Sequence, residues 1–366
     1  MSSANDKKIK LPRFAIVFFC IAAVCLILYL IGIFYTPFAD FFNRYVSSFF
    51  RGLLASLTNI LPFSLAEILI ISSPVILSLL IIFAIKKYTK TWRDVGIYVV
   101  SVLSVLALFF GAFTMTFGLG YYTSTLEEKL ELERAEVSAK ELAETAEWLI
   151  EHINAEIDNI EFEEKSSSIM PYSIKEMNAK LLDAYKTLGE NYDFIPTLSS
   201  RVKPIMLSKP MTYTHITGVY TFFTGEANLN TNSPDYAIPY TAAHELAHQR
   251  GIAREDEANF VAFLVCTASD DAYLRYCGYI GLCEYVLNAI HGADPDLYNT
   301  TLKNLDKRAI YEMIAYSDFF EKYRDNIAAD ISGAVNDAYL QVNNTEGTAS
   351  YGLVVDLAVS YYKSLK

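Results

Sequence analysis

The chain has 366 residues, 52% of them hydrophobic, with 42 acidic against 30 basic side chains. This length exceeds that of a typical single domain and predicts two parts. Residues 1–118 hold 10 basic and 4 acidic side chains, which leaves 20 basic and 38 acidic ones for residues 119–366. A second part this acidic is not expected to bind nucleic acid, and we interpret its charge as solubilising.

Apolar runs concentrate in the first third of the chain. Each is long enough to cross about 30 Å of hydrocarbon as a helix. The first run is too long for the apolar region of a signal peptide and lacks a small-residue cleavage site. We therefore predict a membrane domain at 1–122, with spans at about 14–35, 65–85 and 95–120, and a second domain at 123–366. The underlying runs are Phe14–Tyr35, Ile68–Ile85 and Val95–Tyr122.

Basic residues are distributed unevenly around these spans. Four precede the first span, four lie between the second and third, and only two lie between the first and second. Because basic loops stay in the cytoplasm, we predict a multi-pass protein of the cell membrane with a cytoplasmic N-terminus and an extracytoplasmic second domain. In that order, the residues are Lys7, Lys8, Lys10 and Arg13; Lys86, Lys87, Lys90 and Arg93; and Arg44 and Arg51.

The segment at 36–62, between the first two spans, has helical periodicity. Its apolar residues recur at steps of three and four, which predicts an amphipathic helix. Such a helix can lie on the outer membrane surface, in contact with the lipid bilayer, or pack against the second domain. Both alternatives remain open. The apolar residues are Phe38, Phe41, Tyr45, Phe49, Leu53, Leu57 and Ile60.

The pentapeptide HELAH in the second domain has the pattern H-E-x-x-H. On a helix, His244 and His248 lie on one face and can offer two imidazole nitrogens to one metal ion. Glu245 projects beside them and can act as a general base on water, as in zinc peptidases. Pro239 suits the first turn of this helix, and Gly251 suits the left-handed position after its end.

A third zinc ligand is expected shortly after this helix, because catalytic zinc (Zn²⁺) takes three protein ligands. Arg254 stands where metzincins have a third histidine, so the ligand must be one of the carboxylates that follow. We favour Glu255, because Asn259 lies one turn beyond it and can orient it. The main alternative is Glu257, which shares its face with apolar residues. The pattern resembles the E-x-E-A helix of gluzincins, which also selects Glu255.

The residues before HELAH predict the substrate-binding strand. Residues 218–224 are β-branched and aromatic, and residues 225–230 complete this stretch. Zinc peptidases usually run an edge strand above the metal helix, to which an extended peptide adds through main-chain hydrogen bonds. Glu226 and Asn228 are candidates for polar groups beside that strand. His215 is either a surface histidine or a group that polarises the substrate carbonyl.

Two capping boxes begin amphipathic helices in the second domain, Ser138-x-x-Glu141 and Ser173-x-x-Glu176. Helical patterns also dominate the chain after HELAH. We therefore expect three N-terminal transmembrane helices and a mainly α (α+β), zincin-like extracytoplasmic domain with a small edge-strand sheet. Cys277 and Cys283 can pair or be free.

Three sequence pieces occur together: GLGYY after the last span, FTGEANLN, and PYTAAHELAHQRGIAREDEANFVAFL. The chain thereby resembles an uncharacterised bacterial family of membrane-anchored HExxH proteins. That family is catalogued as a domain of unknown function and regarded as candidate zinc peptidases. One position departs from the pattern, since the resemblance leads us to expect asparagine at Gly120. This departure puts little in doubt, because the position is remote in sequence from the metal motif.

The resemblance and the motif imply a membrane-anchored zinc peptidase acting on a protein or peptide substrate. An intramembrane protease is disfavoured, because HELAH lies far in sequence from any long apolar run. The main rival is a catalytically silent membrane receptor or scaffold that keeps zinc for structure. Glu245 argues against that rival, because a structural zinc site needs no base.

Overall fold

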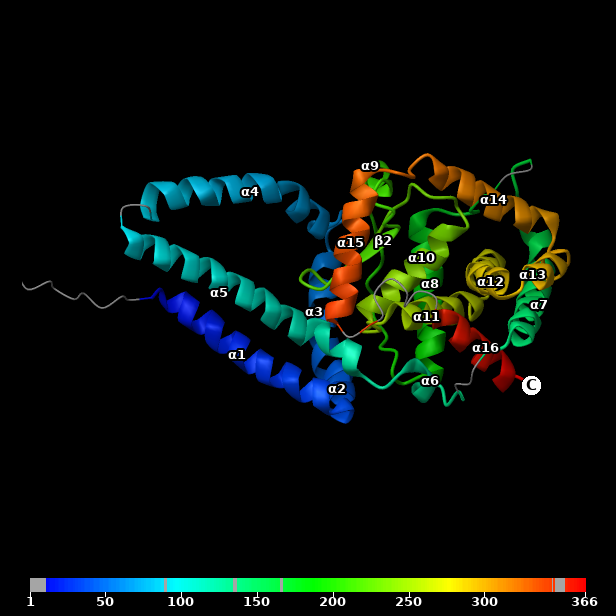
Figure 1. The fold of residues 1–366 in the computed structure, drawn as a ribbon, viewed down its shortest axis with the longest axis horizontal. Helices are drawn as coiled ribbons and strands as arrows, with labels where there is room; N and C mark the ends of the chain where they lie inside the picture. Colours follow the sequence, from blue (N-terminus) through cyan, green and yellow to red (C-terminus); the bar gives the residue numbers. More distant parts are fainter. Residues whose placement is uncertain (1–10, 89–90, 134–136, 165–166, 344, 346–352) are drawn as a thin grey trace, which may run out of the picture.

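The computed structural model describes residues 11–88, 91–133, 137–164, 167–343, 345 and 353–366. Three long helices extend from one side of a mainly helical domain (Figure 1). They are α1 (Arg13–Phe34), α4 (Leu65–Tyr88) and α5 (Trp92–Thr116). All three are long and apolar enough to cross a membrane, and most of their apolar side chains are exposed. Of the basic flanks, Lys7, Lys8, Lys10 and Lys90 lie outside the described residues.

The third long helix is shorter than its apolar run. It ends at Thr116 instead of about residue 120, because Phe117 leaves the helical conformation with φ −142°. A 3₁₀ turn, η2 (Gly118–Tyr122), then leads the chain into the second domain. The end of the apolar run therefore belongs to the core where α5 meets this domain, with Leu119 and Tyr121 buried.

The segment between the first two long helices has two different faces. It forms α2 (Thr36–Phe41), a π-helix η1 (Phe42–Ser47) and α3 (Ser48–Asn59). One face packs on the second domain, where Ala55 and Thr58 are buried and a side chain at Gly225 would meet the α3 backbone. The packing alternative is thus confirmed for one face. Apolar residues line the other, exposed face: Phe41, Tyr45, Phe49, Leu53, Leu57 and Ile60.

Arg51 on α3 joins the long helices to the domain. Its buried guanidinium donates to the carbonyl oxygens of Thr116, at 2.7 Å, and Arg250, at 3.3 Å. These carbonyls belong to the C-terminal ends of α5 and α10 (Ala237–Gln249), whose dipoles place partial negative charge there. Burial lowers the pKa of Arg51 to about 10, so the residue stays charged at neutral pH.

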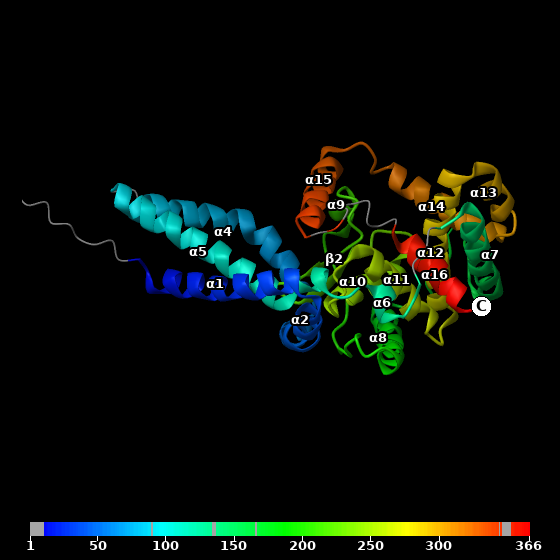
Figure 2. The same ribbon diagram turned by 60° about the horizontal axis from the view of Figure 1, so that its bottom comes forward.

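The second domain is built mostly from helices around one apolar core (Figures 1 and 2). Helix α12 packs along α7, and α11 packs between α10 and α12. The remaining described elements are α6 (Leu126–Lys129), α7 (Ala139–Glu156), η3 (Ile157–Asn159), α8 (Ile174–Asn191), α9 (Ser208–Thr212), α11 (Glu255–Thr267), α12 (Ala272–Ala293), α13 (Pro295–Leu302), α14 (Lys307–Glu321), α15 (Ile327–Val342) and α16 (Val354–Ser364).

Two local predictions about this domain can be checked directly. Both predicted capping boxes are present and begin α7 and α8, since the side chains of Ser138 and Ser173 accept from the third backbone N–H of their helices. Cys277 and Cys283 are buried and free. Cys277 and Cys283 form no disulfide with each other, so helix packing holds this part of the domain together.

A three-stranded sheet has the order β1–β3–β2, with β1 (Lys203–Pro204), β2 (Gly218–Thr221) and β3 (Glu226–Leu229). The strands β2 and β3 form an antiparallel hairpin, in which Gly218 pairs with Leu229. The prediction that residues 218–224 provide an edge strand is confirmed for β2. Among the described strands, none pairs with the outer edge of β2.

Glu226 and Asn228, the candidates for polar groups beside the substrate strand, lie on the strand that pairs with β2. Both lie on the central strand β3 and are buried away from the cavity described below. Glu226 forms a 2.6 Å ion pair with Lys203 and accepts from the first backbone N–H groups of α4. The Asn228 amide donates to the carbonyl oxygen of Val219. These residues join the sheet to the second long helix and stabilise the hairpin.

Candidate metal centre

The HELAH motif lies on α10, which has Pro239 in its first turn. Gly251 follows the helix with φ +96°, so the predicted left-handed position is confirmed. A side chain there would also collide with Arg51. The sharp turn at Gly251 returns the chain so that the N-terminus of α11 packs against α10. Glu255 is the first residue of α11 and therefore faces the two histidines.

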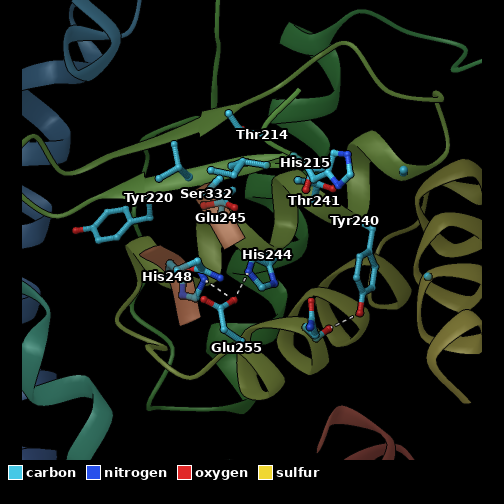
Figure 3. A pocket seen from close by; sticks show the side chains of 18 of the residues that line it. Thr214, His215, Tyr220, Tyr240, Thr241, His244, Glu245, His248, Glu255 and Ser332 are labelled. Carbon is cyan, nitrogen blue, oxygen red and sulfur yellow. Dashed lines mark hydrogen bonds and ion pairs between the residues drawn. The ribbon is translucent and has the colours of Figure 1, made fainter. Parts of the chain in front are cut away.

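Three donor groups converge between these helices (Figure 3). The Oε2 atom of Glu255 lies 3.1 Å from Nε2 of His244 and 3.4 Å from Nε2 of His248. All three side chains are nearly buried, and their donor atoms lie within 4.8 Å of one another. Among the described residues, this is the group of His, Cys, Asp and Glu side chains whose spacing suits a metal ion.

The donor set and its spacing fit zinc. Zinc bonds of 2.0–2.1 Å in a tetrahedral site place neighbouring ligand atoms about 3.3 Å apart. Both measured separations from Glu255 lie close to this value. In addition, Nδ1 of His248 donates to the carbonyl oxygen of Ile252 at 2.7 Å, which directs Nε2 towards Glu255. Such an outer hydrogen bond is typical of a metal-binding histidine.

Charge within the cluster is balanced without a metal by a proton on His248. Burial alone lowers the pKa of this imidazole, but the Glu255 carboxylate outweighs burial and raises the pKa to about 9. Conversely, the imidazolium lowers the pKa of Glu255 against the effect of its burial. Metal binding must therefore displace the Nε2 proton, because only the unprotonated nitrogen is a ligand.

Glu245 lies beside the histidines, between α10 and strand β2 (Figure 3). Burial raises the pKa of its carboxyl group to about 7, although both imidazoles and the backbone N–H of Tyr220 lower it in part. Among the described residues, nothing donates a hydrogen bond to its Oε2 atom. The group is thus held through one oxygen, while the other is free to take a proton.

Gly218 leaves the space that Glu245 occupies. A Cβ atom at this position would lie 2.5 Å from Oε1 of Glu245. We expect Gly218→Ala to displace the carboxylate and to lower, on the order of 10²-fold, the peptide hydrolysis that the sequence predicts, with metal content unchanged. Cleavage rates and bound metal should be compared with Gly292→Ala, because a Cβ at Gly292 meets no atom within 4 Å. Full activity in Gly218→Ala would contradict a role for the position of Glu245.

The other two carboxylates at the start of α11 point elsewhere. Glu257 accepts from the backbone N–H of Leu126 at 2.9 Å and from the guanidinium of Arg254 at 2.6 Å. Asp256 is half-buried, and burial together with neighbouring Glu257 raises the pKa of its carboxyl group to about 7. Only Glu255 of the three faces both histidines, as the face analysis of the sequence predicts.

The cluster forms one wall of a cavity of about 690 Å³. Strand β2 contributes Gly218, Val219 and Tyr220, and α12 contributes Tyr285 and Asn288. Helix α15 also lines the cavity, through Ala329, Ser332, Gly333, Asn336 and Tyr339. The cavity therefore brings together β2, the metal-ligand cluster and a helix far along the chain.

Asn259 and His215 both line this cavity, and Asn259 lacks its expected contact with Glu255. No hydrogen bond joins the Asn259 side chain to Glu255 among the described residues, and this amide lies beside Tyr285. His215 has φ +58°, and its Nε2 donates to the carbonyl oxygen of Tyr323 at 2.7 Å. His215 is thus the exposed surface histidine of the first alternative, and its bond to the Tyr323 carbonyl ties it to the link between α14 and α15.

Sequence distance gives a wrong impression of how far the cluster lies from the long helices. The ring of Phe117, the residue after α5, lies 6.0 Å from the His248 ring, between centroids. Gly120 lies against the turn that follows the metal helix, because a Cβ there would approach Ala253 and the carbonyl of Gly251. Gly120 is remote from the metal helix in sequence but not in space. The premise that HELAH lies far from the apolar runs holds in sequence but not in space.

Two structural roles were not identified from the sequence. Arg51 joins α3 to the ends of α5 and α10, and Gly218 leaves room for the Glu245 carboxylate. Arg51 is a lone basic residue with Ala55 and Thr58 one and two turns away. That small-residue face within an apolar helix indicates close packing, and it could have identified Arg51 as buried. Gly218 has no comparable signal, because its role depends on the approach of a distant helix.

The arrangement defines a protein with an HExxH cluster of candidate metal ligands at the base of three long apolar helices. Residues 42–359 match the family model described as "Protein of unknown function (DUF3810)", and the chain belongs to this family. No curated protein and no solved structure gives a significant match.

Proposed function

We propose that this protein is a membrane-anchored, zinc-dependent peptidase. The observation that carries the proposal is the convergence of His244, His248 and Glu255, with Glu245 beside them and edge strand β2 above. Two histidines and one glutamate are the ligand set of thermolysin-like catalytic zinc sites. A purely structural site would have no need of a buried carboxylate adjacent to the metal.

In this proposal His244, His248 and Glu255 hold the zinc ion. When bound, zinc supplies Lewis acidity that activates a water and polarises the scissile carbonyl. The carboxylate of Glu245 accepts the proton of the attacking water and passes it to the nitrogen of the leaving amine. The backbone N–H of Tyr220 holds Glu245 in position for both transfers.

Strand β2 is the proposed binding site for substrate main chain. Its outer edge is unpaired in the sheet, and Gly218, Val219 and Tyr220 line the cavity. An extended peptide can add to this edge as a fourth strand through main-chain hydrogen bonds. Its scissile bond would then lie between β2 and the metal helix, next to Glu245.

The proposed location is the cell membrane, with α1, α4 and α5 as spans. Lys86, Lys87 and Arg93 lie at the ends of α4 and α5 that are distant from the second domain (Figure 1). Basic residues favour the cytoplasmic side. The N-terminus is therefore proposed to be cytoplasmic and the peptidase domain extracytoplasmic.

Metal removal tests the proposal. The full-length protein, purified in detergent without chelators, should carry about one zinc ion per chain and cleave peptides from a proteome-derived library. Treatment with a chelator should abolish cleavage, because the water is no longer activated, and added zinc should restore it. Metal content is measured by mass spectrometry, and products are identified by their new termini. Cleavage that survives complete zinc removal would exclude this function.

A further inference from the structure

Helix α15 has two opposite faces. The inner face lines the cavity with small and polar residues, as described above. The outer face carries aliphatic residues at helical spacing, and these are far more exposed than a water-soluble domain normally allows. Their exposed fractions are 76% for Ile327, 60% for Ile331, 65% for Val335 and 79% for Val342.

The position of α15 relates this outer face to the long helices. In Figures 1 and 2, α15 lies at the side of the domain from which α4 and α5 extend, and its axis runs across theirs. The cavity lies on the domain side of α15. The aliphatic face therefore points towards the region beside the spans, where the outer half of a bilayer would be.

Aromatic contacts fix the level of α15 along the spans. The ring of Tyr339 lies 6.3 Å from that of Phe113, in the last turn of α5. The β2–β3 turn also contacts α5, both in its last turn and one turn nearer its N-terminus. Its Phe222 ring lies 5.3 Å from Phe113, and its Phe223 ring lies 5.9 Å from Phe109. The C-terminal half of α15 is thus level with the end of a span.

We propose that the outer face of α15 docks on the lipid bilayer and forms a membrane-bound roof over the cavity. The inference rests on the proposed membrane anchoring, but not on peptidase activity. An amphipathic helix at the interface buries its apolar face about 5–10 Å into the boundary between headgroups and acyl chains. Burial of isoleucine and valine removes apolar surface from water, which is the driving force for docking.

Charge has little part in this docking. The flank of α15 carries Asp330 and Asp337, and neither attracts an anionic lipid surface. Apolar burial by itself therefore has to hold the helix in place, so docking should occur on zwitterionic lipid and persist at high salt. The partner surface is a bilayer, whatever its headgroup charge.

Docking would define how substrate reaches the cavity. The two ends of α15 are held by His215, through the Tyr323 carbonyl, and by Tyr339, whose hydroxyl bonds that of Tyr121 at 3.2 Å. A helix held at both ends and covered by lipid leaves access along the membrane surface. For the proposed peptidase activity, on which this consequence alone rests, the substrate class is then peptide segments that lie next to the bilayer, such as stretches flanking another protein's membrane span.

Spin labelling of the full-length protein in zwitterionic nanodiscs tests the docking. Cys20→Ser removes the exposed cysteine, and the other four cysteines are buried. Single labels are then attached to Ile331→Cys and Val335→Cys. Leu77→Cys in α4 serves as the lipid control, and Asp330→Cys on the flank of α15 and Lys303→Cys serve as water controls. Power saturation compares collisions with oxygen, which concentrates in lipid, and with a water-soluble nickel complex.

Docking predicts that labels at Ile331 and Val335 collide more with oxygen than with nickel, as the label at Leu77 does, also at high salt. The labels at Asp330 and Lys303 should show the reverse. A lipid signal at Leu77 with a water signal at Ile331 and Val335 would overturn the docking alone. A water signal at all positions would overturn the anchoring as well. Labels on α15 that are immobilised and reach neither reagent would indicate a protein contact and also overturn the docking.

Discussion

Glu245→Gln is expected to keep zinc and to lose peptide hydrolysis by roughly 10²–10⁴-fold. The amide has nearly the shape of the carboxylate, so the contact with Gly218 remains, but glutamine cannot accept the proton of the attacking water. None of the three proposed metal ligands is altered. Zinc content and cleavage rate, both measured on the full-length protein, separate the two effects.

The outcome of this substitution also distinguishes peptidase from scaffold. If wild type and Glu245→Gln both bind zinc and neither cleaves peptides, the silent receptor or scaffold becomes the better explanation. If Glu245→Gln cleaves as fast as wild type, another group acts as the base. Because zinc content is measured in both proteins, an unfolded variant is not mistaken for an inactive one.

Glu255→Ala is expected to lose most of the bound zinc. It removes one of three ligands and leaves two imidazoles, which form an incomplete site for zinc. The substitution also removes the carboxylate that raises the pKa of His248 to about 9. Zinc per chain, measured after dialysis against a weak chelator, should fall well below the wild-type value.

Glu257→Gln is the matched control, two residues further along the same helix. Glutamine keeps an oxygen that can accept from the backbone N–H of Leu126 and preserves the shape of this buried side chain. Zinc content should therefore stay near the wild-type value. Loss of zinc in Glu257→Gln but not in Glu255→Ala would reassign the third ligand to Glu257. Retention in both would place the ligand elsewhere.

Local periodicity was sufficient to predict much of the candidate site. Positions four apart share a helix face, so the spacing of His244 and His248 by itself brings their rings together. The same geometry separates Glu255 from Glu257 at the start of α11, because only one of them can share the face of Asn259. Apolar run length likewise predicted three long helices, although packing against the second domain ended α5 early.

Other parts of the site depend on contacts between distant segments, which local patterns do not contain. Nothing in FTGEANLN reveals that Glu226 turns to Lys203 and the start of α4, since that contact depends on how the sheet meets a helix 160 residues earlier. His215 is exposed, as expected of a surface histidine, but its bond to the carbonyl of Tyr323, 108 residues away, could not be read from the sequence.

Sequence alone determined the chemistry that the protein can offer: two imidazoles and a carboxylate at helical spacing, beside long apolar runs. Tertiary structure decided where that chemistry lies. It set Phe117 against His248 at the end of α5, placed Gly218 where only a hydrogen leaves room for Glu245, and laid α15 across the cavity. The physical reason is that helix periodicity is local, whereas the cavity is made by packing between segments far apart in the chain.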